Sequence, residues 1–174
     1  MLSLERQKAK MTHVNPRCEV HGDEHVRAAD LKFTFDTSND VLSAFDPALK
    51  SSLYRKADGD GEQLDIEPGW LPKLRFPRMG LVEWKSEIVG GTVQIFYGLD
   101  SSVDLEIRIA DKFEFGLKDG GTVTVSFRIQ CKPTEEQFGR LCYLVQESVE
   151  LSMWPPKADQ APQQELGTEV AATA

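Results

Sequence analysis

The chain has 174 residues, of which 40% are hydrophobic and 28% charged, and its formal net charge is −8. These values are typical of one globular domain and exclude a fibrous or wholly disordered chain. The acidic total argues against a protein that coats nucleic acid by bulk attraction, and no stretch approaches the roughly 18 apolar residues of a membrane span.

The N-terminal region predicts two strands. Residues 7–20 form a weak strand pattern that Pro16 interrupts, and a proline inside a strand indicates a sheet edge or a bulge. A polar loop is expected over residues 21–25. Apolar and polar residues then alternate over residues 31–35, which is the period of a half-buried strand.

A helix is predicted next. Residues 36–39 (DTSN) supply helix-capping side chains, and apolar residues then recur at helical spacing over residues 40–54. Pro47 lies inside that span, so we expect a kink or a break there. Residues 57–72 are rich in acids, glycine and proline, which predicts a loop.

Two hairpins are predicted in the middle of the chain. A strand near residues 79–89 is followed by Gly90-Gly91 and by the strand-like run TVQIFY, a pattern that indicates a tight hairpin turn. The second hairpin has alternating residues from Leu105 to Phe115, a turn at Asp119-Gly120-Gly121, and a β-branched strand over residues 122–129.

The C-terminal region predicts a capped helix and one more strand. Thr134-Glu135-Glu136-Gln137 has the form of a capping box. Four residues at helical spacing then predict a buried face, namely Phe138, Leu141, Cys142 and Val145. A short strand follows over residues 149–153, and residues 155–174 have the composition of a disordered tail.

Together these elements predict an α+β fold that is mainly antiparallel β. We expect a sandwich or a strongly curved sheet with two helices, formed by one β-rich domain over residues 1–154 and followed by a disordered C-terminal tail.

The charge is distributed unevenly, which marks a candidate nucleic-acid-binding segment. Residues 58–67 contain five acids and no base, whereas residues 69–85 contain four bases and one acid. Cations beside aromatic rings suit single-stranded nucleic acid, because phosphates need charge and bases stack on rings. The candidate binding residues are Trp70, Lys73, Arg75, Arg78, Trp84 and Lys85. An ordinary strand with a buried apolar face and a solvated basic face gives the same pattern.

Two candidate metal sites are weak. Cys18, His21 and His25, with His13 or Asp23, have a spacing that zinc could accept, but no second cysteine pair follows, so we predict no metal. The acidic segment starts like a calcium-binding loop at Asp58, but its twelfth position is a glycine where such loops need an acid.

Signatures of catalysis are absent from the sequence. It contains no G-x-S-x-G, no Walker A pattern, no G-x-G-x-x-G and no H-E-x-x-H. We therefore predict that the protein is not an enzyme and uses no cofactor.

Three runs carry a resemblance to a known group of proteins. DVLSAFDPALKSSLY, LPKLRFPRMGLVEWK and GGTVTVSFRIQ with EEQFGRLCYL resemble uncharacterised proteins of tailed bacteriophages and prophages, over about residues 7–153. Such proteins tend to be encoded near early recombination and replication genes. The resemblance implies a host-cytoplasmic setting and an association with nucleic acid, and it supplies no catalytic residues.

The function expected from sequence is non-catalytic. We expect a phage early protein that binds single-stranded DNA or assists recombination or replication, with no membrane contact. The alternative is a protein-binding module that occludes a host nucleic-acid-handling or defence protein. The three cysteines, an odd number without framework spacing, agree with a reducing compartment. The sequence does not determine the oligomeric state.

Overall fold

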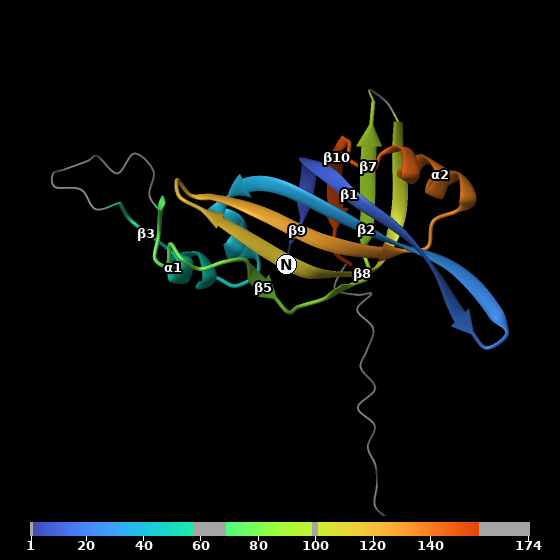
Figure 1. Cartoon of the computed structure of the whole chain (residues 1–174), viewed down its shortest axis with the longest axis horizontal. Coiled ribbons are helices and arrows are strands. Elements are labelled where there is room, and N and C mark those ends of the chain that lie inside the picture. Colours follow the sequence, from blue (N-terminus) through green and yellow to red (C-terminus); the bar gives the residue numbers. More distant parts are fainter. Residues whose placement is uncertain (1, 58–68, 99–100, 157–174) are drawn as a thin grey trace, which may run out of the picture.

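Six antiparallel strands close into a β-barrel in the computed structural model, which describes residues 2–57, 69–98 and 101–156 (Figure 1). Around the barrel the order is β1, β2, β9, β8, β7, β10 and back to β1. Their bounds are Leu4–His21 (β1), Glu24–Ser38 (β2), Thr92–Tyr97 (β7), Ser101–Lys118 (β8), Thr122–Cys131 (β9) and Ser148–Trp154 (β10). Closure leaves the ring without a free edge strand. The predicted, mainly antiparallel β fold is confirmed, and the curved sheet closes fully.

Strict alternation along the strands fills the barrel interior. In β9 every second residue from Val123 to Cys131 is buried, and the residues between them lie on the outer wall. Phe127 lies at the centre, stacked on Phe113 with ring centroids 5.7 Å apart and near Phe33 at 5.8 Å. This aromatic stack supplies much of the apolar area that the barrel removes from water.

Two short helices close one end of the barrel. The predicted helix over residues 40–54 is broken at Pro47 into a 3-10 helix, η1 (Asn39–Ala44), and an α-helix, α1 (Leu49–Leu53). Phe45, between them, contacts the rings of Phe113 and Phe115 at centroid distances of 5.1 and 4.8 Å. A proline cannot donate the helical hydrogen bond, so the chain turns here and places Phe45 against the barrel.

A small second sheet lies outside this end. It consists of β3 (Tyr54–Arg55) and β4 (Lys73–Leu74). Tyr54 is fully buried, and its hydroxyl lies 3.1 and 3.0 Å from the carbonyl oxygens of Lys118 and Thr122. The side chain thereby ties the small sheet to both strands of the β8–β9 hairpin. Burial raises the pKa of Tyr54 above its usual value.

The hairpin predicted at Gly90-Gly91 is wrong. Both β6 (Ile88–Val89) and β7 pair with β8 in one continuous register, so the chain runs straight through the two glycines along β8. Gly91 is needed for a close approach, because a Cβ atom there would collide with the carbonyl oxygen of Trp154. Its φ of +104° also favours glycine. Another short strand, β5 (Val82–Trp84), pairs with the same edge of β8.

Two β-bulges in β8 place Asp111 on the outer wall of the barrel. The register between β8 and β9 shifts between Ile107 and Ile109 and again between Asp111 and Glu114. Each one-residue bulge turns the following side chains to the other face, and the second bulge restores the first orientation. Lys112 sits at the second bulge with a φ of +52°, which is strained for a residue other than glycine.

Asp111, which these bulges turn outward, joins an ionic network on the barrel wall. Arg128 on β9 donates from Nε to Asp111 at 2.7 Å and from Nη1 to Asp30 on β2 at 3.2 Å. Arg17 Nε lies 2.8 Å from Asp30 Oδ1, in ion-pair contact but misaligned for a hydrogen bond. Because both acids are nearly buried, ion pairs with these arginines offset the cost of burying their negative charges.

The β1–β2 hairpin extends beyond the barrel. The loop predicted over residues 21–25 is a two-residue turn, Gly22-Asp23, between strands that continue on both sides of it. β10 pairs with β1 only as far as Lys10, so Pro16 lies where β1 has a partner on one side alone. That is the edge position that the proline predicted.

The C-terminal helix α2 (Glu135–Tyr143) begins with the expected capping box at Thr134 and Gln137. Leu141 is its fully buried residue, with Phe138 packed beside it. The prediction that Cys142 is buried is wrong, because its thiol is exposed. Cys142 follows Leu141 by one residue, or about 100° around the helix, and so points away from the barrel.

Two predictions fall outside the described residues. The acidic loop over residues 58–67 and most of the tail over residues 155–174 are not among them. Within the described part of the chain, no helix has the length and apolar character that a membrane crossing requires.

Candidate nucleic-acid interface

Trp70 is an exposed ring on a fixed backbone. Its side chain is 55% exposed, although the carbonyl groups on both sides of it are held by buried or half-buried parts of the fold. Lys50 Nζ donates to the carbonyl of Gly69 at 2.8 Å, and Asn39 Nδ2 donates to the carbonyl of Leu71 at 2.8 Å. Such anchoring presents an aromatic face to solvent with little conformational entropy left to lose on binding.

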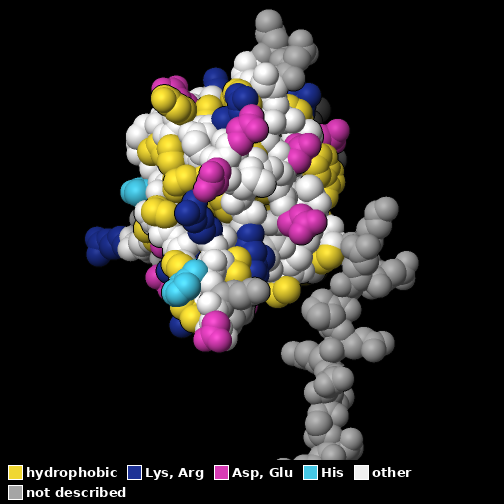
Figure 2. All heavy atoms as spheres, turned by 90° about the vertical axis from the view of Figure 1, so that its right-hand side faces the viewer, with side chains coloured by type: hydrophobic (Ala, Val, Ile, Leu, Met, Phe, Trp, Pro, Cys, Tyr) yellow, Lys and Arg dark blue, Asp and Glu magenta, His cyan; other side chains and the backbone are white. Residues whose placement is uncertain are grey.

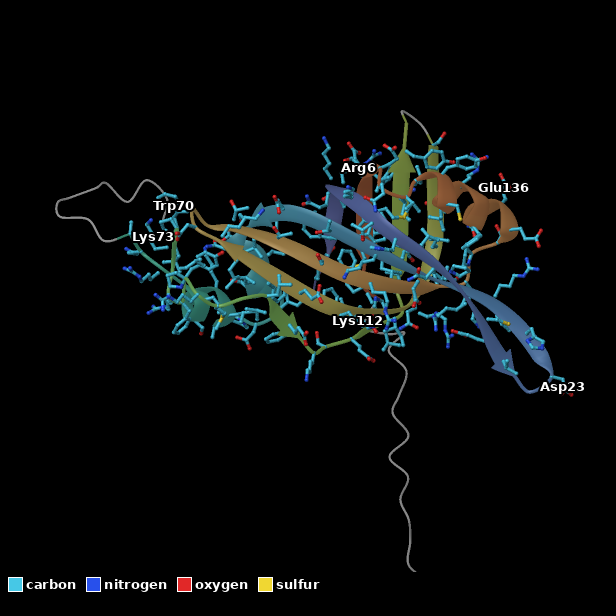
Figure 3. The ribbon with its side chains drawn as sticks, viewed as in Figure 1. Arg6, Asp23, Trp70, Lys73, Lys112 and Glu136 are labelled. Atoms are coloured by element: carbon cyan, nitrogen blue, oxygen red, sulfur yellow. The ribbon has the colours of Figure 1, made fainter. Side chains whose placement is uncertain are left out.

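Anchoring continues along the segment that carries Lys73. Gly120 donates its N–H to the carbonyl of Pro72 at 2.8 Å, and Asp119 Oδ1 accepts from the N–H of Leu74 at 3.3 Å. Lys73 is exposed and lies directly opposite Arg55 in the β3–β4 pair. Figure 3 shows Lys73 and Trp70 together at the end of the molecule beyond the β8–β9 turn. Two cations therefore face each other beside the exposed ring.

Arg75 has a structural role. Its Nε lies 2.8 Å from the carbonyl oxygen of Ser51 and 3.2 Å from that of Tyr54. Its backbone N–H also donates to the carbonyl of Leu53 at 2.9 Å. Arg75 thus fastens the segment to α1 and β3, and we expect it to support the interface more than to contact a ligand.

Phe76 and Arg78 form a turn beside this anchor. The ring of Phe76 is 54% exposed, and the turn is closed by a hydrogen bond from Met79 N–H to the carbonyl of Phe76 at 2.9 Å. Lys73 and Arg78 have no acidic side chain within salt-bridge distance among the described residues. We define the end patch as Trp70, Lys73, Phe76 and Arg78.

The structure separates two of the predicted residues from the end patch. Trp84 is half-buried and packs against Phe45, and Lys85 lines a groove on the outer wall together with Asp111 and Lys112. Figure 3 places Lys112 away from Trp70 and Lys73, near the middle of the barrel. The six predicted residues therefore do not form one surface.

Sequence reasoning left out one member of the end patch, Phe76, and one neighbour of it, Arg55. In an ordinary strand Phe76 would lie on the buried apolar face, because it alternates with Arg75, but β4 ends at Leu74 and the ring turns outward. Arg55 lies eighteen positions before Lys73 and is brought opposite it by β3–β4 pairing. No local pattern in the sequence marks that pairing, since both strands have only two residues.

The opposite end of the molecule has a different character. Figure 2 shows acidic and basic side chains interspersed on that face, without a continuous basic area. At the hairpin the Cys18 Sγ lies 3.4 Å from His25 Nδ1. Among the described residues no three acidic, histidine or cysteine side chains gather closely enough to hold a metal ion.

Comparisons of this chain with protein-family models, with curated proteins and with solved structures found no match. The functional argument therefore depends on the geometry of the chain itself.

Proposed function

We propose that the end patch binds single-stranded nucleic acid, single-stranded DNA in the first instance, without catalysing a reaction on it. The observation that carries the proposal is Trp70, an exposed indole held by hydrogen bonds on both sides of its backbone. A ring that only filled a core would be covered, and a ring on a free loop would not need such anchoring.

The mechanism combines stacking with charge neutralisation. One base stacks on Trp70 and another on Phe76, and each stacked base contributes about 1–3 kcal/mol by alanine substitution. Lys73 and Arg78, which lack acidic partners among the described residues, neutralise the phosphates between those bases. Stacking tolerates every base, so we expect little sequence preference.

The overall charge of −8 shapes this binding. The acidic remainder of the surface repels nucleic acid, which favours binding at local basic areas such as the end patch. Binding should therefore be weak at high salt.

A protein partner is the second candidate. Met79 and Leu81, which follow the end patch in sequence, are 46% and 69% exposed. Aliphatic side chains contribute little to base stacking but are usual in protein interfaces, so these two residues favour a protein-binding module. Such a module could occlude a host nucleic-acid-handling or defence protein.

One titration separates the two candidates. Fluorescence anisotropy of a labelled oligothymidylate should report binding that weakens as salt rises, because counterions are released. The double variant Lys73→Gln/Arg78→Gln should lose most of this binding. Lys132→Gln/Arg140→Gln changes the net charge equally on exposed residues elsewhere and should bind as the unmodified protein does. Binding that is absent, or equal in both variants, would reject the nucleic-acid proposal.

A further inference from the structure

The outer wall of the barrel has a groove where β1 and β2 separate. Pairing between these strands begins at Lys10 and Thr34, so residues 4–9 of β1 pair only with β10, and residues 35–38 of β2 pair only with β9. The groove between them has a volume of about 500 Å³. Its polar lining consists of Gln7, Lys8, Lys10, Thr34, Asp36, Lys118, Thr124 and Ser148.

The chemistry of this groove suits phosphate. Lys8, Lys10 and Lys118 supply three ammonium groups against one acid, Asp36. Asp36 accepts hydrogen bonds from Thr124 and from Lys118, the latter at 2.9 Å, and these bonds hold the pKa of its carboxyl below the usual value. The facing edges of β1 and β2 also carry peptide groups that do not bond to each other, and backbone N–H groups bind anions well.

The acid that lies opposite Lys8 is already paired. Glu150 on β10 lies opposite Lys8 in the β1–β10 register, and its Oε2 lies 3.0 Å from Arg6 Nη1. Lys8 and Lys10 have no acidic side chain within salt-bridge distance among the residues that the structure describes. Both ammonium groups therefore remain available to a ligand.

The β8–β9 turn lies between the groove and the end patch. Lys118 ends β8, and the turn at Gly121 borders Trp70, because a Cβ atom on Gly121 would lie 3.6 Å from the indole Nε1. Lys10 lies beside Thr34, which pairs with Ser126 on β9. Ser126 is five residues beyond Gly121, or roughly 16 Å along the strand. The exposed ring thus lies at the β8–β9 turn, and the three lysines lie on the outer wall that begins at this turn.

We propose that a single strand bound at the end patch continues across the β8–β9 turn, with its phosphates in the groove of Lys118, Lys10 and Lys8. This inference rests on the proposed function and adds the path of the strand. Bases contact Trp70, and the sugar–phosphate backbone lies in the groove. The contact beyond Trp70 is electrostatic, because the polar lining offers cations and hydroxyl groups without an exposed ring.

The test compares two oligothymidylates, one of about 4 and one of about 16 nucleotides, which bracket the site sizes of small single-strand-binding barrels. The variant Lys8→Gln/Lys10→Gln should bind the short strand as the unmodified protein does. For the long strand its salt dependence should become shallower by about 1.4 in the slope of log K against log salt, since each phosphate contributes about 0.7. Lys8→Arg/Lys10→Arg should keep the full slope.

The outcomes distinguish this inference from the proposed function. If Lys73→Gln/Arg78→Gln loses binding to both strands while Lys8→Gln/Lys10→Gln keeps the full slope on the long one, the groove path is wrong and the end patch stands. If the unmodified protein binds neither strand, both proposals are wrong. Equal melting temperatures of the variants, expected because both lysines are exposed, show that the comparison concerns binding.

Discussion

The indole of Trp84 packs edge-on against the ring of Phe45, with the two ring centroids 6.3 Å apart. Through Phe45 it is connected to the aromatic stack of the barrel, although the sequence places it in a basic segment that looks like a binding surface. Trp84 and Trp70 therefore form a natural pair for experiment, one ring inside the packing and one outside it.

Trp84→Ala should destabilise the protein and leave oligonucleotide binding unchanged. We expect a loss of about 2 kcal/mol in the free energy of unfolding, roughly half the value for a fully buried aromatic ring, because Trp84 is half-buried. Trp70→Ala should do the reverse, with affinity falling about tenfold and stability within about 0.5 kcal/mol. Chemical denaturation and anisotropy measure the two effects, and an exchange of the two results would contradict the assignment.

Tyr54→Phe should weaken the connection between the small sheet and the barrel. The substitution removes a buried hydroxyl that bonds to the carbonyls of Lys118 and Thr122, and an unpaired buried group costs about 1–3 kcal/mol. The raised pKa of Tyr54 adds a pH effect.

Folding favours the neutral phenol, so its contribution is complete below about pH 10 and is lost as the pH rises through the higher folded pKa. The free energy of unfolding of the unmodified protein should fall more steeply above pH 10 than that of Tyr54→Phe. Parallel pH profiles for the two proteins would show that the hydroxyl is not in this environment.

Gly91→Ala should be among the most damaging single-methyl substitutions in the chain. The added Cβ meets the carbonyl oxygen of Trp154 and lies 3.2 Å from the Cα of Pro155, while φ at this position is +104°. We expect a loss of more than about 3 kcal/mol. Gly98 has a φ of +74° with nothing near its Cβ position, so Gly98→Ala should cost only about 1 kcal/mol. Similar melting temperatures for the two variants would argue against the close β7–β10 approach.

Arg128→Met should lower the stability of the protein, because one guanidinium group pairs with both acids on the outer wall. The change leaves Asp30 and Asp111, both nearly buried, without their shared cation, and breaking such a pair costs about 3 kcal/mol or more. Arg140→Met removes an exposed ion pair with Glu136 and should leave the melting temperature unchanged. Part of the lost stability should return in Arg128→Met/Asp111→Asn, because one of the stranded charges is gone.

Local patterns predicted most elements of this fold. The hairpin around Gly120-Gly121, the capping box at Thr134 and the edge position of Pro16 depend on residues close together in sequence, and each appears as expected. Closure of the sheet into a barrel depends on pairing between β1 and β10, which are separated by most of the chain, and no short pattern contains that information.

Two structural features could not be predicted from the sequence pattern, each for a physical reason. The paired bulges in β8 cancel in phase, so the strand has the same inward alternation before and after them, while Asp111 between them turns outward to Arg128. Gly90-Gly91 has the composition of a turn, but there the glycines serve to let two backbones approach. In the candidate segment, the outward position of Phe76 depends on where the two-residue strand β4 ends, and the packing of Trp84 depends on contact with Phe45, which is distant in sequence.

The ring order also determines how this protein can fold. β10 pairs with β1 on one side and with β7 on the other. It is therefore the last strand to be added, and its pairing closes an open five-stranded sheet into the barrel. During synthesis on a ribosome, the edge of β1 that pairs with β10 has no partner until residue 154 has emerged. Pairing at such separation is slow, in the range of milliseconds to seconds for β-rich domains. Until β10 docks, the nascent chain exposes two unpaired edges, which makes this interval the one in which a chaperone or a second nascent chain can capture it.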